Sequence, residues 1–302
     1  MNKLLIAICL VLSFLGSAQQ EEQSSLYMYN GLFYNPAYAG SRNTLNASIV
    51  GRYQWVGFDK APKTFWASVN SPIKGRNLAA GIHLISDQVG VRKKTSFYGN
   101  IAGSIQITKR GKIAAGISLG ADNVVLNYTD LHVIDENDPY STLVYSNTSL
   151  NTGVGVYYYG EKSYVGFSIP RIIERKDMFA SSQFTVLQRH FYFSAGHVFK
   201  INSVLNLKAF TLMKFVPGVP VTADLNASLI LYDKYWIGAL YRFNESAGIN
   251  LSYIINNKLT IAYAYDFPIN GLTSYQSGSH ELALQFDISR YSKNSIYSPR
   301  YF

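Results

Sequence analysis

Apolar and polar residues alternate with a period of two along most of this 302-residue chain after residue 43. In residues 221–231 every odd position is apolar, from Val221 to Leu231, whereas Asp224 and Asn226 occupy even positions. Successive side chains of a β-strand point to opposite faces, so each such segment has one apolar and one polar face. The pattern predicts an all-β protein.

The composition limits what the apolar faces meet. Charged residues make up only 15% of the chain, whereas a soluble domain has about 25%. The hydrophobic fraction of 48% excludes a disordered chain. After the N-terminus no apolar run reaches about 18 residues, which excludes a helical membrane protein. Alternation with few charges therefore indicates strands that face lipid on one side.

The alternating segments number about fourteen, and an even number is typical of bacterial outer-membrane barrels. We predict a transmembrane antiparallel up-and-down β-barrel of the outer-membrane type over residues 44–288. Its expected strands are 44–54, 64–71, 78–86, 95–108, 112–127, 150–159, 164–169, 189–199, 205–215, 221–231, 235–243, 247–255, 259–267 and 279–288.

Short and long links between these segments largely alternate. In an outer-membrane barrel the short turns lie in the periplasm and the long loops outside, so we expect both chain termini in the periplasm. Aromatic residues such as Tyr158, Phe199 and Tyr235 flank the short turns, as in an interfacial girdle. The expected short turns are Lys74–Asn77, Lys109–Lys112, Gly160–Ser163, Lys200–Val204, Tyr232–Lys234 and Asn256–Lys258, and the longer links include 128–149, 170–188 and 268–278.

A soluble β-sandwich is the competing interpretation, because soluble sheets alternate as well. Three features favour the membrane barrel. The apolar faces are nearly free of charge, a soluble fold of this length needs one very large core, and charged edge-strand protection is sparse. A closed barrel also satisfies every backbone hydrogen bond, which a lipid environment requires.

The two ends of the chain do not follow the barrel repeat. Residues 1–18 resemble a signal peptide, with Lys3 before an apolar stretch and small residues up to Ala18. Cys9, the only cysteine, lies in this segment, so the mature chain has no disulfide. Residues 19–43 form either a periplasmic extension or a segment folded into the lumen. Residues 289–302 form a polar and aromatic tail that the pattern does not place.

Several segments carry a resemblance to a known family. The most specific are NPAYAGSR at 35–42 and QWVGFDKAPKT at 54–64. Others are YVGFSIP at 164–170, DLNA at 224–227, AYD at 264–266 and SGSHE at 277–281. With these segments the chain resembles the PorP/SprF family of type IX secretion system membrane proteins from Bacteroidetes, and the resemblance spans essentially the whole mature chain.

This resemblance implies a place in the cell envelope and a set of partners. Family members work with the secretion and gliding machinery, including its periplasmic ring components. Some serve one secreted partner protein, often a large surface adhesin, and are thought to receive its C-terminal sorting domain and hold it at the cell surface. The resemblance thus implies an outer-membrane protein that binds and helps to secrete or anchor a partner.

Some charged residues occupy strand positions that alternate with the apolar ones, so we expect their side chains to point into the barrel. They brace the interior or contact a protein segment inserted there. The set is Arg52, Lys208, Lys214, Asp224, Arg242, Asp266, Glu281 and Asp287.

Two further segments carry candidate contacts. In the 35–40 segment, Pro36 and Gly40 suit a tight entry into the first strand, or its aromatics, Phe33, Tyr34 and Tyr38, form an exposed docking surface. Trp55, Phe58 and Pro62 lie in the first outer loop, where they constrict the lumen or bind the secreted partner. The candidate partner-binding residues are Asn35, Pro36, Tyr38, Arg52, Trp55, Phe58, Asp224, Arg242, Asp266 and Glu281.

Enzymatic and cofactor signatures are weak. His190 and His197 are an odd number of positions apart, so on one strand they face opposite sides and do not share a metal. We expect no catalytic, metal or cofactor site, and a hydrolase is the least favoured class because no His has a nucleophile motif beside it.

The charge distribution bears on the partners. Basic residues are spread through turns and loops, which argues against nucleic acid. The short clusters 92–94 and 171–176 are solvated loops or contacts to lipopolysaccharide phosphates or an acidic partner. A diffusion porin is the alternative to the secretion function.

Overall fold

The computed structural model describes residues 21–130, 143–179, 182–255, 258–271 and 276–288. The expected signal peptide with Cys9, His132 and the tail 289–302 lie outside these residues. Fourteen strands close into one antiparallel barrel in which sequence neighbours pair. They are β1 (Leu45–Tyr53), β2 (Lys63–Pro72), β3 (Leu78–Val89), β4 (Arg92–Thr108), β5 (Gly111–Asn127), β6 (Val144–Gly160), β7 (Ser163–Ile169), β10 (Phe191–Lys200), β11 (Leu205–Val216), β12 (Val219–Leu231), β13 (Tyr235–Arg242), β14 (Ser246–Ile255), β15 (Leu259–Pro268) and β16 (Ser279–Ile288).

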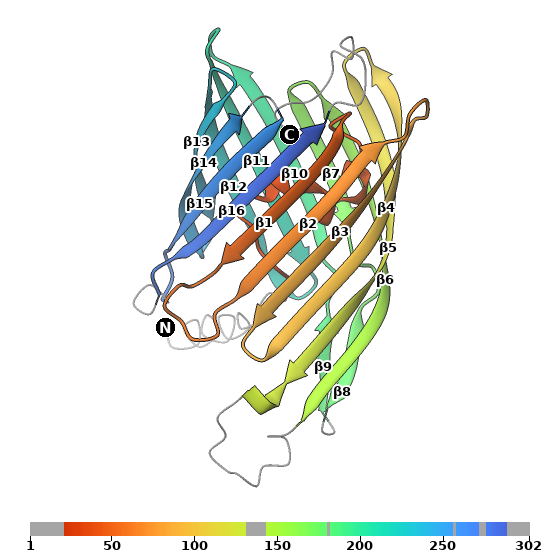
Figure 1. Ribbon diagram of the computed structural model, residues 1–302, viewed down its shortest axis with the longest axis vertical. Helices are drawn as coiled ribbons and strands as arrows, with labels where there is room; N and C mark the ends of the chain where they lie inside the picture. Colours follow the sequence, from red (N-terminus) through yellow and green to blue (C-terminus); the bar gives the residue numbers. More distant parts are fainter. Residues whose placement is uncertain (1–20, 131–142, 180–181, 256–257, 272–275, 289–302) are drawn as a thin grey trace, which may run out of the picture.

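The first and last strands close the barrel along a continuous ladder. β1 pairs with β16 from Leu45 opposite Ile288 to Tyr53 opposite His280. The predicted fourteen-strand barrel is confirmed, and Figure 1 shows this seam at the front. Among the described residues no helix is long and apolar enough to span a membrane.

Alternation places apolar side chains outside and polar ones inside. On β12, Leu225 and Leu229 are 46% and 42% exposed, whereas Asp224 and Ser228 are buried. Because a closed barrel has only its interior to bury side chains, the buried parity faces the lumen. The outer apolar residues therefore form the lipid-facing surface.

The two ends of the barrel differ in their links. At one end, which we call the short-turn end, the links are 73–77, 109–110, 161–162, 201–204, 232–234 and 256–258. The opposite, long-loop end carries the links 54–62, 128–143, 170–190 and 269–278 together with the tight links 90–91, 217–218 and 243–245. β1 starts and β16 ends at the short-turn end, as expected for the periplasmic side.

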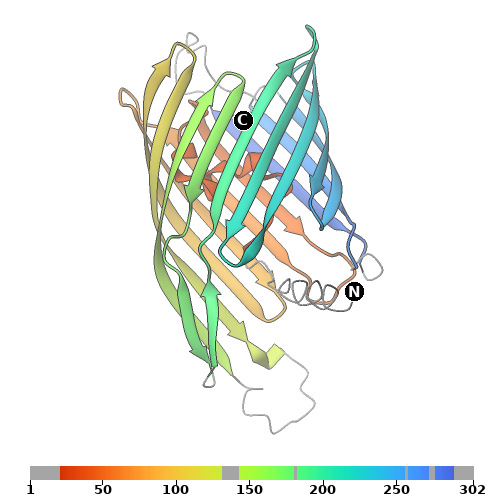
Figure 2. The same cartoon turned by 180° about the vertical axis from the view of Figure 1, so that it is seen from behind.

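The long-loop end projects on one side of the barrel. β4, β5 and β6 each have 17 residues, and β5 and β6 continue past the rim (Figures 1 and 2). The link 170–190 contains a separate hairpin, β8 (Arg175–Phe179) with β9 (Ser182–Leu187), which the sequence did not predict. Val124 and Leu187 form a small buried cluster between β5 and this hairpin. A single turn of 3₁₀-helix, η3 (Tyr128–Asp130), ends the described part of the projection.

Residues 21–44, which we call the plug, lie within the barrel (Figures 1 and 2, red). The plug contains η1 (Tyr27–Tyr29), α2 (Gly31–Tyr34) and η2 (Pro36–Tyr38). Every residue from 24 to 42 is buried except Gly31, which is partly buried. Phe33, Tyr34 and Tyr38 are thus covered by the barrel wall, and the idea that they form an exposed docking surface is wrong.

Candidate functional site

The described chain begins near the long-loop end. Glu21 bonds Arg171 Nη1 at 2.7 Å, and Glu22 lies 2.8 Å from Lys94 Nζ. Lys94 stands at the start of β4 and Arg171 follows β7, so both mark the long-loop end. Only the barrel itself starts and ends at the short-turn end, and the expectation that the N-terminal part of the chain also begins on that side is not met by Glu21 and Glu22. The plug therefore runs through the lumen from the long-loop end towards the start of β1.

Electrostatics hold Glu21 in its charged form. Burial by itself disfavours a carboxylate, but the positive charges of Arg171 and Lys94 hold the pKa of Glu21 well below its usual value. Arg171 also donates to Asp122 at 3.2 Å, and Asp122 accepts a hydrogen bond from Tyr98. The start of the plug is thus tied to β4, β5 and the β7–β10 link.

A second anchor joins the plug to a buried ionic cluster. Ser25 donates its backbone N–H to Glu281 at 2.7 Å and its hydroxyl to Asp266 at 2.5 Å. Ser24 donates to the other carboxylate oxygen of Glu281. Arg52 bonds Glu281 at 2.9 Å and Asp266 at 2.7 Å. The plug backbone and hydroxyls thus donate hydrogen bonds to both carboxylates.

Arg242 extends this cluster towards β12. Its guanidinium bonds Asp224 at 2.8 Å and Glu245 at 3.1 Å and reaches Ser25 Oγ at 3.4 Å. The sequence predicted that Arg52, Asp224, Arg242, Asp266 and Glu281 face inward, and the structure brings them together. They bond one another, Glu245 and the plug residues Ser24, Ser25 and Leu26. The protein segment that they contact belongs to this chain.

The 35–37 segment packs against a part of the wall that lacks side chains. Asn35 donates to the carbonyl of Val156 at 2.9 Å, and its other amide atom accepts from Ala37 N at 2.9 Å. A Cβ atom on Gly155 would stand 2.1 Å from Asn35 Oδ1, and one on Gly116 would stand 2.5 Å from Ala37 N. Glycines on β5 and β6 therefore let the plug backbone approach the wall.

Aromatic rings fill most of the remaining space around the plug. Tyr27 packs edge-on against Phe210 with ring centroids 5.3 Å apart, and Tyr38 packs against Tyr157 at 5.7 Å. Burial raises the pKa of Tyr29, whose hydroxyl bonds Ser252, to about 12. A cavity of about 40 Å³ remains beside Tyr27 and Tyr38. That is room for a few waters at most, because one water needs about 10–15 Å³.

The plug leaves the lumen through a third anchor at the short-turn end. Arg42 forms a two-pronged pair with Asp287, at 3.1 and 2.8 Å, and Thr44 and Asn46 donate to the same carboxylate. Gly40, with a φ of +71°, donates its N–H to Asn70 at 3.0 Å. Both ends of the plug thus bond β16, through Glu281 and Asp287.

Trp55 and Phe58 lie apart from the other candidates, in the 54–62 link at the long-loop end. The backbone of Val56 exchanges hydrogen bonds with the 269–278 link, to Gly278 O at 2.9 Å and from Ser277 N at 2.7 Å. This pairing fixes the loop, while the Phe58 side chain remains 48% exposed. The loop presents an aromatic residue to the outside of the barrel.

One arrangement typical of hydrolases was not found from the sequence. Ser163 Oγ and His197 Nδ1 lie 2.6 Å apart, brought together by the β7–β10 pairing. The described residues show no carboxylate bonded to this His, so the pair lacks the third member of a triad. Among the described residues no group of three His, Cys, Asp or Glu side chains is placed to hold a metal.

Several plug contacts were also missed by sequence reasoning. Lys94 and Asp122 have inward parity on β4 and β5, which is a signal that could have found them. Ser24 and Ser25 carry no such signal, because no periodicity extends into the plug. The glycine wall was visible only as single glycines within strand patterns, where they often mark the close approach of another backbone.

Solved outer-membrane barrels share this fold. CymD, a monoaromatic hydrocarbon channel, is 10% identical with a TM-score of 0.52, over 92% of this chain and 96% of CymD. The Pseudomonas putida toluene transporter TodX is 8% identical with a TM-score of 0.50, over 91% of this chain and 96% of TodX. These similarities concern the fold alone. No curated protein sequence matches the chain.

The family comparison covers nearly the whole chain. Residues 16–286 match the family described as type IX secretion system membrane protein PorP/SprF. The match includes the plug, the β8–β9 hairpin and all fourteen barrel strands except the last two residues of β16. The resemblance carried by the 35–42 and 54–64 segments is therefore confirmed. The chain belongs to the PorP/SprF family of type IX secretion system membrane proteins and is an outer-membrane β-barrel.

Proposed function

We propose that this barrel binds the C-terminal sorting domain of a secreted partner protein and helps to secrete or anchor that partner at the cell surface. The partner docks on the long-loop end, outside the lumen. The observation that carries this proposal is the plug, whose buried residues already use the inward charged side chains. On this proposal the chain catalyses no reaction.

The long-loop end offers the surface for such docking. Phe58 is exposed on a loop that is fixed by backbone pairing to 277–278, and aromatic anchors on rigid supports dominate many protein interfaces. β5, β6 and the β8–β9 hairpin project from the same end of the barrel (Figure 1, bottom). We further propose that the periplasmic ring components of the type IX machinery contact the short-turn end.

Binding measurements with a matched pair of variants test the docking surface. The ligand is the purified sorting domain of an exported protein encoded beside this gene, and the readout is its dissociation constant for the barrel in detergent. Phe58→Ala is expected to weaken binding about tenfold or more, as for an interface anchor. Phe199→Ala, which removes a side chain that is 50% exposed at the short-turn end, leaves it unchanged. Equal affinities for both variants would contradict docking at the long-loop end.

Conductance distinguishes this function from a diffusion porin. The purified barrel in a planar bilayer is expected to show no constant open pore, because the plug occupies the lumen. A large and steady conductance of the intact protein would favour the porin. Liposome swelling with small sugars provides the same comparison without an applied voltage.

A further inference from the structure

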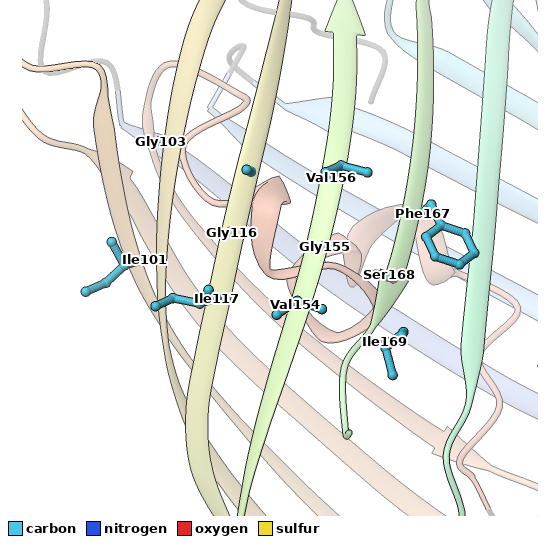
Figure 3. Close-up of a pocket in the computed structure, with 11 residues that line it drawn as sticks. Ile101, Gly103, Gly116, Ile117, Val154, Gly155, Val156, Phe167, Ser168 and Ile169 are labelled. Carbon is cyan, nitrogen blue, oxygen red and sulfur yellow. The ribbon is translucent and has the colours of Figure 1, made fainter. Parts of the chain in front are cut away.

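A hollow of about 510 Å³ lies on the lipid-facing surface of β4, β5, β6 and β7. Figure 3 shows apolar side chains in two rows across these strands, with Ile101, Ile117, Val154 and Ile169 in one row and Val156 and Phe167 in the other. Ile101, Ile117 and Val156 are 56%, 60% and 47% exposed, so the rows stand out from the wall.

The hollow exists because the row that contains Val156 and Phe167 has no large side chains where it crosses β4 and β5. Gly103 and Ala115 lie opposite each other at outward positions of these strands, and Ala115 is opposite Val156 on β6. On the inner side, Ala37 of the plug lies against Gly116, so the wall is backed by protein (Figure 3). The hollow is therefore a firm apolar groove that faces hydrocarbon.

Basic side chains crowd the short-turn end of the same four strands. Lys109 and Arg110 form the β4–β5 turn and Lys162 lies in the β6–β7 turn, all exposed to solvent. Arg110 pairs with Glu161 at 3.4 Å, but both side chains are partly or largely exposed and such pairs are weak. Tyr158, on the outer face of β6, places an amphipathic ring below these charges.

The distance between the charges and the groove fits one leaflet. Phe167 and Ile169 are four and six residues from Ser163 at the turn. At about 3.3 Å per residue this is roughly 13–20 Å along the strand, and strand tilt shortens the depth. Half of the hydrocarbon core is about 15 Å. A lipid whose phosphate lies at the turns therefore reaches the groove with its acyl chain.

We propose that β4–β7 form a binding site for one anionic glycerophospholipid of the leaflet at the short-turn end. Its phosphate bonds Lys109, Arg110 and Lys162, and one acyl chain lies in the groove over Gly103 and Ala115, beside Ile117 and Val156. Exposed Ile105 and Ile113 line the path between headgroup and groove. Cationic side chains near the membrane surface attract an anionic headgroup, and the apolar groove selects a ligand that carries an acyl chain.

Native mass spectrometry of the folded barrel tests the site. The detergent-purified protein is incubated with phosphatidylglycerol and washed, and the bound lipid is counted. One molecule is expected on the wild type. Gly103→Leu, whose Cβ atom meets nothing closer than 3.5 Å, fills the groove and lowers retention at least tenfold. The double variant Lys109→Gln with Lys162→Gln is expected to lower retention equally, because it removes two cationic contacts to the headgroup phosphate.

Two matched variants and two other lipids serve as controls. Gly99→Leu lies on the same face of β4 outside the groove, and Lys234→Gln removes an exposed charge from the link between β12 and β13; both retain the lipid. The proposal is overturned if Gly103→Leu and Gly99→Leu retain equal amounts. Equal retention of zwitterionic phosphatidylethanolamine, or displacement by lipopolysaccharide from the opposite leaflet, also overturns it. Heat-dependent gel migration verifies that each variant is folded.

Discussion

At the scale of single residues, the lumen depends on buried charges that have no access to water. Arg242 is fully buried, and its guanidinium neutralises Asp224 and supports Ser25. Buried ion pairs contribute little net stability when they are complete, but loss of one partner leaves an uncompensated charge. Parity predicted which charged residues face inward. It did not predict their partners, because the partners come from a segment without periodicity.

Arg242→Met is expected to lower the free energy of unfolding by about 3–5 kcal/mol, since Asp224 then remains buried without its cation. Urea unfolding in detergent micelles, followed by intrinsic fluorescence, measures the change. Arg110→Met provides the control, because that side chain is 73% exposed in its pair with Glu161. Its effect should stay within about 1 kcal/mol. Similar losses of unfolding free energy for both variants would contradict a larger contribution from the buried cluster.

At the scale of elements, the barrel strands were predicted well, whereas the start of β6, the β8–β9 hairpin and the plug helices were not. Continuous alternation located all fourteen barrel strands within a few residues, except for the start of β6. That segment, from Val144 to Ser149, projects past the barrel rim and is mostly polar on both faces. It therefore lacks the alternation of apolar and polar residues on which the prediction rested. The β8–β9 hairpin lies in the same surroundings. The plug was missed as an element because its short turns of helix follow no regular pattern.

The contact between the plug and β6 is sensitive to one added methyl group. Gly155→Ala places a Cβ atom about 2.1 Å from Asn35 Oδ1, so the 35–37 segment must shift. Overpacking of this kind costs about 1–3 kcal/mol. We expect lower stability and transient conductance steps in planar bilayers. Gly51→Ala is the control, because nothing lies within 4 Å of its Cβ position. A silent Gly155→Ala barrel with wild-type stability would contradict the close packing.

The start of the plug should respond to acid through Glu21. Its pKa is lowered by Arg171 and Lys94 despite burial, so its charged form stabilises the folded state at pH values above the usual 4.5. That contribution is lost as pH falls below 4.5. Wild type is therefore expected to be more stable than Glu21→Gln at pH 7, and the difference should shrink in acid. A difference in unfolding free energy that does not change between pH 7 and pH 3 would contradict this.

At the scale of the whole molecule, a wide barrel is made into a sealed one by its own N-terminal segment. A barrel of about eight strands is filled by its own interior side chains, whereas a fourteen-stranded one has space left over. Composition and alternation predicted the barrel and its membrane face. They left the content of the lumen open, because burial of the plug depends on contacts between distant parts of the chain.

Removal of residues 21–38, which joins Gln20 to Ala39, is expected to produce steady single-channel conductance in planar bilayers. The strands and their ladder remain, so the barrel should still fold and migrate as a heat-modifiable band. The same variant should keep its affinity for the sorting domain if docking is at the long-loop end. A deletion variant that folds but stays electrically silent would show that other segments close the lumen.

The plug bonds the last strand at two heights, through Glu281 and Asp287, and it runs directly into the first strand. β16 is the last barrel strand in the chain, so it is synthesised after the plug residues that bond it. The strand that closes the barrel against β1 is therefore also the strand that holds the plug near both of its ends.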